Sequence, residues 1–177
     1  MSQDKIGLIG FGSQAKRIIK ILKEKKNNIN VIFRKNLKKK NKSLITNKVK
    51  DIESCNIIFI LSPNSTHFNY INRLKKNRYI FCEKPPVDKI GQLKLLKNIN
   101  LSKIYFNYNY RYSKINDALK KTKKYKFGKL LYGNIIYGHG LATKKSYINS
   151  WRSRKSNQGV YEILGIHLID LILNNYK

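Results

Sequence analysis

Short apolar runs alternate with stretches of helical spacing over residues 5–107 of this chain. Ala15, Ile18, Ile19 and Leu22 recur at intervals of three and four, which places them on one face of a helix. The pattern predicts strands at Lys5–Ile9, Asn30–Arg34, Leu44–Thr46, Asn56–Leu61, Tyr79–Cys82 and Lys103–Asn107. It predicts helices at Ser13–Lys26, Val49–Ser54, Ser65–Lys76 and Asp88–Asn98.

This alternation predicts an α/β fold, a Rossmann-type doubly wound parallel sheet with helices on both faces. Asn56–Leu61 is apolar without interruption, as expected of a strand that is buried on both sides. Ligands of such folds bind at the carboxyl ends of the strands. We expect this first domain to occupy residues 1–108.

Residues 109–177 have a different pattern. Ser113–Lys124 and Val160–Asn174 have helical spacing, Leu130–Tyr137 alternates as a strand does, and Thr143–Asn157 reads as a polar loop. A lone strand has no partner for its backbone groups or its apolar face. We therefore expect an incomplete second α/β domain, in a chain truncated at its C-terminus.

The formal net charge of +29 raises the question of a nucleic-acid partner. Only 7 of the 38 basic residues are Arg, the residue that binds phosphates and bases bidentately, and the lysines are spread over nearly every predicted helix and loop. We expect solvated lysine-rich surfaces and no nucleic-acid partner. No apolar run reaches the roughly 18 residues that span a membrane, so we expect no membrane partner.

The two cysteines, Cys55 and Cys82, both lie in apolar runs without metal-ligand spacing. We expect buried free thiols, no metal site and a reducing, cytoplasmic location.

The first predicted strand ends in Gly10-Phe11-Gly12-Ser13-Gln14-Ala15, which opens directly into a helix. Gly10 permits the tight turn, Gly12 lets the backbone approach a pyrophosphate, and Ala15 allows close packing of helix and sheet. The N-terminus of the helix offers N–H groups and a positive dipole end to phosphates. This pattern predicts a dinucleotide site; the alternative is a glycine turn without a ligand.

The end of the second strand bears on the choice of cofactor. A carboxylate there would bind the ribose hydroxyls of NAD, whereas this chain has Arg34. A guanidinium suits a 2′-phosphate, so NADP is slightly favoured over NAD. The alternative is that Arg34 is one more basic surface residue.

Two further loops follow buried strands. Ser62-Pro63-Asn64 leads to His67 in the first turn of a helix, where Asn64 or its neighbours could instead serve as caps and His67 could be exposed. Glu83-Lys84-Pro85-Pro86 forms a rigid charged loop. A lysine beside a cationic nicotinamide would have its ammonium form disfavoured, which favours proton transfer; the alternative is an exposed ion pair.

Together these residues resemble the Gfo/Idh/MocA family, the glucose-fructose oxidoreductase and inositol dehydrogenase-like enzymes. The resemblance rests on the Gly10 loop, Pro63-Asn64 with His67, Glu83-Lys84-Pro85, Asn109-Tyr110-Arg111-Tyr112, Trp151-Arg152, and Gly165-Ile166-His167 with Asp170. It implies that residues 109–177 begin a C-terminal substrate and oligomerisation domain. It also implies an NAD(P)-dependent oxidoreductase acting on a sugar or polyol, and a homo-oligomer at full length.

By this resemblance Lys84 and His167 are catalytic. The resemblance also implies that the glycine loop binds the cofactor together with Ser62, Pro63, Asn64, His67, Glu83 and Lys84. Arg111, Trp151 and Arg152 would lie near the substrate.

One departure weakens the resemblance at the catalytic centre. Many catalytic members carry an Asp four residues before the histidine, where this chain has Ile163. Glu162 is one position away, about 100° around a helix, and would not point the same way. A non-catalytic dinucleotide-binding module or an inactive fragment therefore stays open as the alternative.

Overall fold

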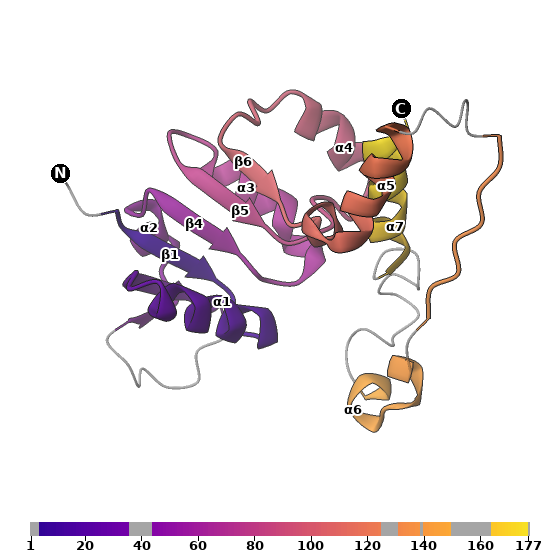
Figure 1. The fold of residues 1–177 in the computed structure, drawn as a ribbon. Coiled ribbons are helices and arrows are strands. Elements are labelled where there is room, and N and C mark those ends of the chain that lie inside the picture. The colour runs from indigo at the N-terminus through magenta and orange to yellow at the C-terminus, as the bar shows by residue number, and fades with distance from the viewer. Residues whose placement is uncertain (1–3, 36–43, 125–130, 139, 150–163, 177) are drawn as a thin grey trace. The chain divides into compact units, whose positions relative to one another are not determined.

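The computed structural model describes residues 4–35, 44–124, 131–138, 140–149 and 164–176. Its backbone divides into two compact units, Met1–Asn107 and Tyr108–Lys177 (Figure 1). Each unit is considered by itself below.

The first unit is built on a parallel sheet, as predicted. Its strands run in the order β3-β2-β1-β4-β5-β6, and every adjacent pair is parallel. The strands are β1 (Ile6–Ile9), β2 (Ile29–Phe33), β3 (Ile45–Thr46), β4 (Ile57–Ile60), β5 (Tyr79–Cys82) and β6 (Ile104–Phe106). The order reverses between β1 and β4, which is the switch point of a doubly wound fold.

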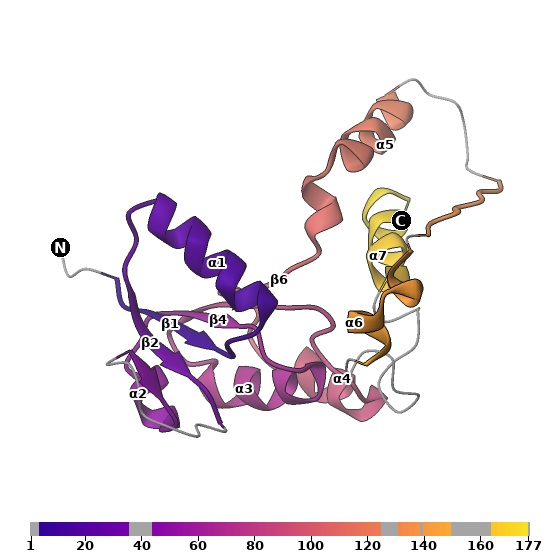
Figure 2. The same cartoon turned by 90° about the horizontal axis from the view of Figure 1, so that it is seen from below.

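Helices cover both faces of this sheet. Helix α1 (Ser13–Glu24) lies on one face, and α2 (Val49–Glu53), α3 (His67–Leu74) and α4 (Ile90–Lys97) lie on the other (Figure 2). A short 3₁₀ turn, η1 (Asn64–Thr66), leads into α3. Right-handed crossovers that lead in opposite directions from the switch point place the helices on opposite faces.

The core is split by the sheet into two layers. The larger layer packs β-strand residues such as Ile58, Ile60 and Ile80 against Ile71 and Leu74 of α3. The smaller layer packs Leu8 and Ala15, with partly buried apolar residues of α1. Ala15 is fully buried, which fits the close approach of α1 to the sheet.

One part of the sheet is less covered than predicted. Phe59, Phe81 and Tyr105 on β4, β5 and β6 stack in a row, with ring centroids 5.1 Å apart at each step. Phe81 is 38% exposed, and Phe59 is half-buried. The expectation that Asn56–Leu61 is buried on both sides is met in part. Ile58 and Ile60 are fully buried on one side of β4, whereas Ile57 and Phe59 on the other side are partly buried against the smaller core layer.

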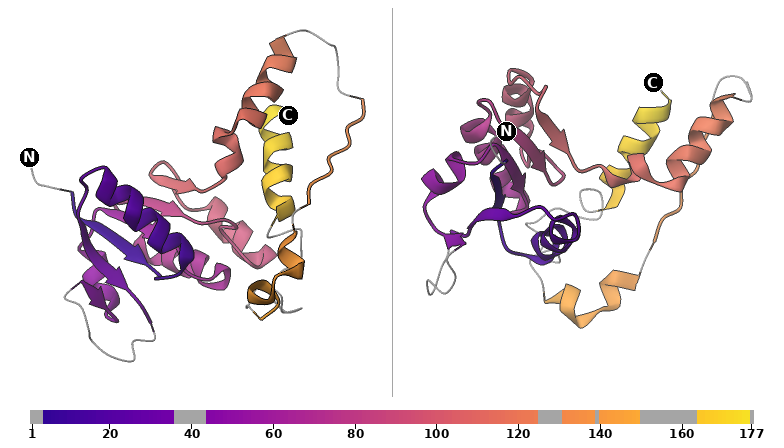
Figure 3. Two further views of the ribbon diagram at one scale, coloured as in Figure 1. Left: turned by 60° about the horizontal axis from the view of Figure 1, so that its bottom comes forward. Right: turned by 60° about the vertical axis from the view of Figure 1, so that its left-hand side comes forward.

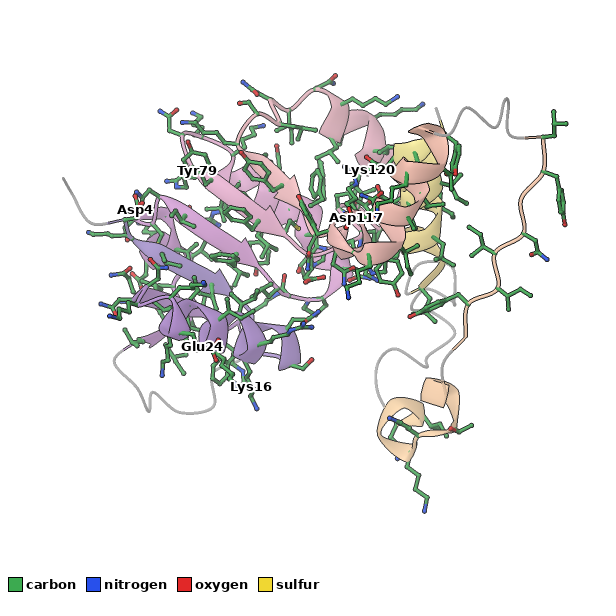
Figure 4. All side chains as sticks on the ribbon, viewed as in Figure 1. Asp4, Lys16, Glu24, Tyr79, Asp117 and Lys120 are labelled. Atoms are coloured by element: carbon green, nitrogen blue, oxygen red, sulfur yellow. The ribbon has the colours of Figure 1, made fainter. Side chains whose placement is uncertain are left out.

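The lysines lie on the solvated surface. Every lysine whose exposure the structure describes is exposed, except the partly buried Lys84. Lys16, for example, projects from α1 away from the sheet (Figure 4). Among the described residues no helix has the length and apolar character needed to cross a membrane.

The second unit is mainly helical over its described residues. It contains η2 (Asn109–Tyr112), α5 (Lys114–Lys124), η3 (Gly140–Thr143), α6 (Lys145–Ile148) and α7 (Ile166–Asn175). Two predictions were wrong here. Residues 131–137 of the expected strand Leu130–Tyr137 form no strand, and no described strand of the second unit lies beside them to pair with. The polar loop at Thr143–Asn157 contains the short helix α6.

Helices α5 and α7 lie side by side and are joined by buried amides (Figure 3). Asn175 Nδ2 donates to Asn116 Oδ1 at 2.8 Å and to Leu171 O at 2.8 Å. Asn116 Nδ2 donates to Arg111 O at 2.6 Å. Asn116 and Asn175 are 1% and 2% exposed, so these bonds are made away from water and fix the approach of α5, α7 and η2.

The variant Asn116→Ala should destabilise this helix pair by about 1–3 kcal/mol, because Arg111 O and the Asn175 amide lose a buried partner. Amide hydrogen exchange in α5 and α7 measures the effect directly. The matched control is Asn174→Ala, whose side chain is exposed on α7. Equal protection in both variants would contradict a stabilising role for the buried amides.

Candidate functional site

Four loops meet at one edge of the sheet because the strand register aligns their ends. Ile9 pairs with Phe33 and Ile60, Ile60 with Cys82, and Cys82 with Phe106. The residues that follow continue these ladders by one hydrogen bond each: Gly10 N to Phe33 O, Leu61 N to Ile9 O, Glu83 N to Ile60 O and Asn107 N to Cys82 O. The predicted cofactor loops of this unit therefore share one edge.

Gly10 makes the turn that sequence analysis assigned to it. Its φ is +102°, a value that side chains rarely adopt. A Cβ on Gly10 would lie 2.7 Å from the carbonyl oxygen of Leu61, a backbone atom of β4's continuation. Both constraints require glycine at the point where β1 turns toward α1.

Gly12 meets a different requirement. It precedes Ser13 as the N-cap of α1, and no side chain caps the helix. A Cβ on Gly12 would meet no protein atom within 4 Å. The described residues therefore leave space beside Gly12 at the N-terminus of α1, where a dinucleotide pyrophosphate would accept hydrogen bonds from the first-turn N–H groups.

The other residues of the glycine loop differ in how deeply they are buried. Phe11 packs against the smaller core layer, and Ser13 is exposed in the first turn of α1. Gln14 is half-buried beside Ala15.

Arg34 directly follows β2 at the same edge. Its backbone N–H donates to Thr46 O at 2.8 Å, which ties this position to β3. The residue is exposed, and its guanidinium has no hydrogen-bond or ion-pair partner among the residues that the structure describes. Its charge is thus available to an anion at the end of β2.

The loop after β4 does not cap the next helix, although the sequence offered Asn64 or its neighbours as caps. Pro63 is the residue before η1, and no side chain caps either η1 or α3. Thr66 Oγ1 instead lies 2.7 Å from Ser62 Oγ and donates to Pro63 O, while Asn64 is half-buried. Thr66 therefore braces the loop, and Asn64 is not needed as a cap.

His67 is not the exposed first-turn residue that the sequence allowed. It is 0% exposed at the start of α3. Nδ1 lies 2.7 Å from Pro85 O, and Nε2 lies 2.8 Å from Ser62 O. Both ring nitrogens therefore lie within hydrogen-bond distance of a backbone carbonyl oxygen. His67 thus links the loop after β4 to the loop after β5 and has no free ring nitrogen for the cofactor.

The loop after β5 carries the charged pair. Glu83 Oε1 accepts a hydrogen bond of 2.6 Å from Asn107 Nδ2, at the end of β6. Lys84 is half-buried and is followed by a cis peptide bond to the buried Pro85. Sequence analysis missed Asn107, whose position beside Glu83 follows only from the pairing of β5 with β6.

In the second unit His167 lies among aromatic rings. Its ring stacks on Tyr110 at 5.1 Å between centroids and meets Tyr108 edge-on at 6.5 Å. The Tyr110 hydroxyl donates to the Tyr137 hydroxyl at 2.7 Å, and this bond raises the pKa of Tyr110 to about 12. His167 lies in the first turn of α7, which packs against η2.

Arg111, the predicted substrate residue, is engaged within its own unit. Its Nε donates to Asp170 Oδ2 at 2.8 Å and its Nη2 to the other oxygen, a bidentate pair. This hydrogen bonding raises the pKa of Arg111. The guanidinium therefore positions η2 against α7. Trp151, Arg152, Glu162 and Ile163 lie outside the described residues.

Both cysteines are buried free thiols, as predicted. Burial raises the pKa of each thiol, and most strongly that of Cys82. Within the described ranges, no group of His, Cys, Asp and Glu side chains could hold a metal ion.

A family described as an oxidoreductase family with an NAD-binding Rossmann fold matches residues 5–103, more than half of the chain. The chain belongs to the Gfo/Idh/MocA family. A comparison with curated proteins found no match. The family assignment confirms the resemblance seen in the sequence and agrees with the Rossmann-type sheet.

Solved structures of dehydrogenases share this fold. Myo-inositol 2-dehydrogenase from Lactobacillus plantarum is similar with a TM-score of 0.76 at 18% identity, over 99% of this chain and 57% of that one. Scyllo-inositol dehydrogenase from Lactobacillus casei, with bound NAD(H) and scyllo-inositol, has a TM-score of 0.73 at 18% identity, over 99% and 56%.

A third similar structure is the WlbA dehydrogenase from Thermus thermophilus in complex with NAD and alpha-ketoglutarate. Its TM-score is 0.70 at 20% identity, over 97% of this chain and 62% of that one. The chain thus spans little more than half the length of these proteins. At these identities the likeness shows the fold.

The variant Gly12→Val should weaken NADH binding about tenfold or more, because its side chain enters the space left for the pyrophosphate. The melting temperature should fall by only about 1–4 °C, since the new side chain meets no protein atom and the cost is that of a poor N-cap. Fluorescence titration and thermal unfolding measure the two effects.

The control for this variant is Gly91→Val in α4, where an added Cβ also meets open space. It should bind NADH as the unmodified protein does. Unchanged NADH affinity in Gly12→Val would remove Gly12 from the pyrophosphate site.

Proposed function

We propose that this chain is part of an NAD(P)-dependent oxidoreductase that transfers hydride between a nicotinamide and a secondary hydroxyl or ketone of a sugar or polyol. The observation that carries the proposal is the position of Lys84. It is the partly buried exception among otherwise exposed described lysines, and it lies on the edge that holds the dinucleotide loops. Family membership and the inositol dehydrogenase folds support the same reaction class.

The first unit would hold the cofactor. Gly10, Gly12 and the α1 N-terminus would receive the pyrophosphate, and Asn64 and Glu83 would line the nicotinamide end. The bound nicotinamide would accept or donate the hydride. Asn107 keeps the Glu83 carboxylate in place through its hydrogen bond.

The chain's own residues would handle the proton. When a hydroxyl becomes a carbonyl, its proton must pass to a side chain within hydrogen-bond reach. Lys84 and His167 are the residues we assign to this role. Tyr110 orients the His167 ring by stacking on it, and the Arg111–Asp170 pair holds η2 to α7.

The second candidate is a dinucleotide-binding module without catalysis. The observations that favour it are that residues 131–137 of the second unit form no strand and that Ile163 stands at the usual Asp position. This candidate keeps the cofactor site and predicts no turnover.

The variant Lys84→Ala separates these candidates. If Lys84 transfers the proton, turnover of a sugar or polyol panel with NAD and NADP should fall about 10²–10⁴-fold, while NADH affinity changes only a few-fold. The control is Lys89→Ala, an exposed lysine just before α4, which should retain activity. Turnover that survives in Lys84→Ala would overturn its role. NADH binding without any turnover in the unmodified protein would favour the binding module.

We also propose a preference for NADP, which rests on Arg34. Arg34→Ser should weaken NADPH binding about tenfold or more, because one charge-assisted contact to the 2′-phosphate contributes about 1.5–3 kcal/mol. NADH affinity should stay within about twofold. Titrations at physiological ionic strength limit the nonspecific attraction of a +29 chain for phosphate.

The charge-matched control is Lys94→Ser, which removes one exposed positive charge from α4. If NADPH and NADH bind the unmodified protein equally well, the preference is wrong. If Arg34→Ser and Lys94→Ser lose the same NADPH affinity, the effect is one of net charge.

A further inference from the structure

Residues 131–138 form an exposed, extended segment of the second unit (Figure 1). Every residue of the segment is exposed, although it contains the large apolar side chains Leu131, Tyr132, Ile135, Ile136 and Tyr137. The backbone of residues 131–136 makes no hydrogen bond to any residue that the structure describes. An extended backbone whose N–H and C=O groups have no partner is a template for pairing with another strand.

One end of this segment is fixed within its own unit. The Tyr137 hydroxyl accepts the hydrogen bond from Tyr110, and the two rings meet edge-on at 6.1 Å between centroids. Because side chains alternate along an extended strand, Tyr132 and Ile136 lie on the face opposite to Tyr137. These two side chains are 81% and 92% exposed. The segment is therefore anchored near Tyr137, while its opposite face and most of its backbone stay open.

Charge limits which surface of this chain can meet a second copy of it. The formal net charge is +29, so two copies repel one another over most of their surfaces. Residues 130–143 contain no Lys, Arg, Asp or Glu, so the segment lacks the lysines that block edge-to-edge pairing of strands. An acidic partner would instead be drawn to the lysine-rich surfaces. The absence of charge therefore favours a second copy as the partner of this segment.

The segment is complementary to itself in the antiparallel direction. A pair centred on Asn134 places Tyr132 of one copy opposite Ile136 of the other. A two-fold axis then repeats this contact, and such an interface closes at two copies. An aromatic side chain opposite a β-branched one is a favourable cross-strand pair, and the two Asn134 amides can donate to and accept from each other.

We propose that residues 131–137 are a dimerisation strand, which pairs antiparallel with the same strand of a second copy of this chain. The pairing satisfies the open N–H and C=O groups and brings Tyr132 and Ile136 of the two copies into contact. One short strand from each copy makes a small interface, so the dimer is weak and reversible. This inference concerns the second unit alone and does not depend on the proposed function.

The oligomeric state of the whole chain is the first test. Sedimentation equilibrium should show a monomer that converts to a dimer as the protein concentration rises. Added salt should strengthen the dimer, because it screens the repulsion between two chains of charge +29. A monomer under all these conditions would overturn the proposal and is the result expected if the segment pairs within its own chain. A dimer that weakens with salt would indicate a bridging polyanion and would also overturn it.

The variant Ile136→Lys tests the surface. The position is exposed, so the monomer should fold normally, and a lysine opposite Tyr132 in both copies should raise the dissociation constant about tenfold or more. The matched control is Ile90→Lys, which makes the same change at the exposed first residue of α4. It should stay within about twofold of the unmodified protein. Equal dissociation constants for the two variants would place the interface elsewhere and overturn the proposal.

A cysteine at the centre of the pair tests the register. The native Cys55 and Cys82 are buried, so Asn134→Cys supplies an exposed thiol. Residues directly opposite each other in an antiparallel pair lie about 4.5–5.5 Å apart at Cα, which a disulfide spans. Oxidised glutathione should therefore convert Asn134→Cys to a covalent dimer more completely than Asn174→Cys, whose position on α7 is also exposed. No excess of covalent dimer in Asn134→Cys would overturn the antiparallel pairing.

Discussion

The close contact between Gly10 and the backbone of Leu61 is the constraint on which the rest of the site depends. A Cβ on Gly10 would approach Leu61 O to 2.7 Å, so β1 and the continuation of β4 meet with no room for a side chain. At φ +102° the chain then leaves the sheet and enters α1. The open space at Gly12 and the exposed N-terminus of α1 both follow from this turn. Because the turn lies at the switch point, the loops after β4 and β5 lie on the same edge.

The parallel sheet was predictable because its signals are local. Buried strands read as apolar runs, and glycine or proline ends each of them. The errors arose where structure depends on a distant partner. Residues 131–137 have the alternation of a strand, but the described part of the second unit contains no strand to pair with them. Phe59 lies in an apolar run, yet it is only partly buried in the sheet. The burial of His67 could not be predicted either, because its two hydrogen-bond partners, Ser62 O and Pro85 O, belong to different loops.

The net charge of +29 comes from lysines and arginines, which occupy different environments in the structure. Three arginines use the several N–H donors of the planar guanidinium. Arg78 donates to the backbone carbonyls of Glu53 and Cys55. Arg73 pairs with the Glu53 carboxylate, and Arg111 forms a bidentate pair with Asp170. Described lysines instead lie on the solvated surface, with Lys84 as the exception. A charge of +29 therefore says little by itself about partners. Lys84 departs from this division because it is half-buried. Of the two described arginines that make no such contact, Arg17 and Arg34, only Arg34 directly follows a strand at the edge that carries the loops after β1, β4 and β5.

In the proposed function, cofactor binding and proton transfer would depend on different parts of the chain. The family match at residues 5–103 nearly coincides with the first unit, which has its own two-layered core and contains every described cofactor loop. Lys84 belongs to that unit, whereas His167, Tyr110 and the Arg111–Asp170 pair belong to the second. The edge that we propose for dinucleotide binding is therefore formed by residues of the first unit alone. The proposed proton transfer by Lys84 and His167 would instead require residues of both units, so it makes the larger demand on the chain.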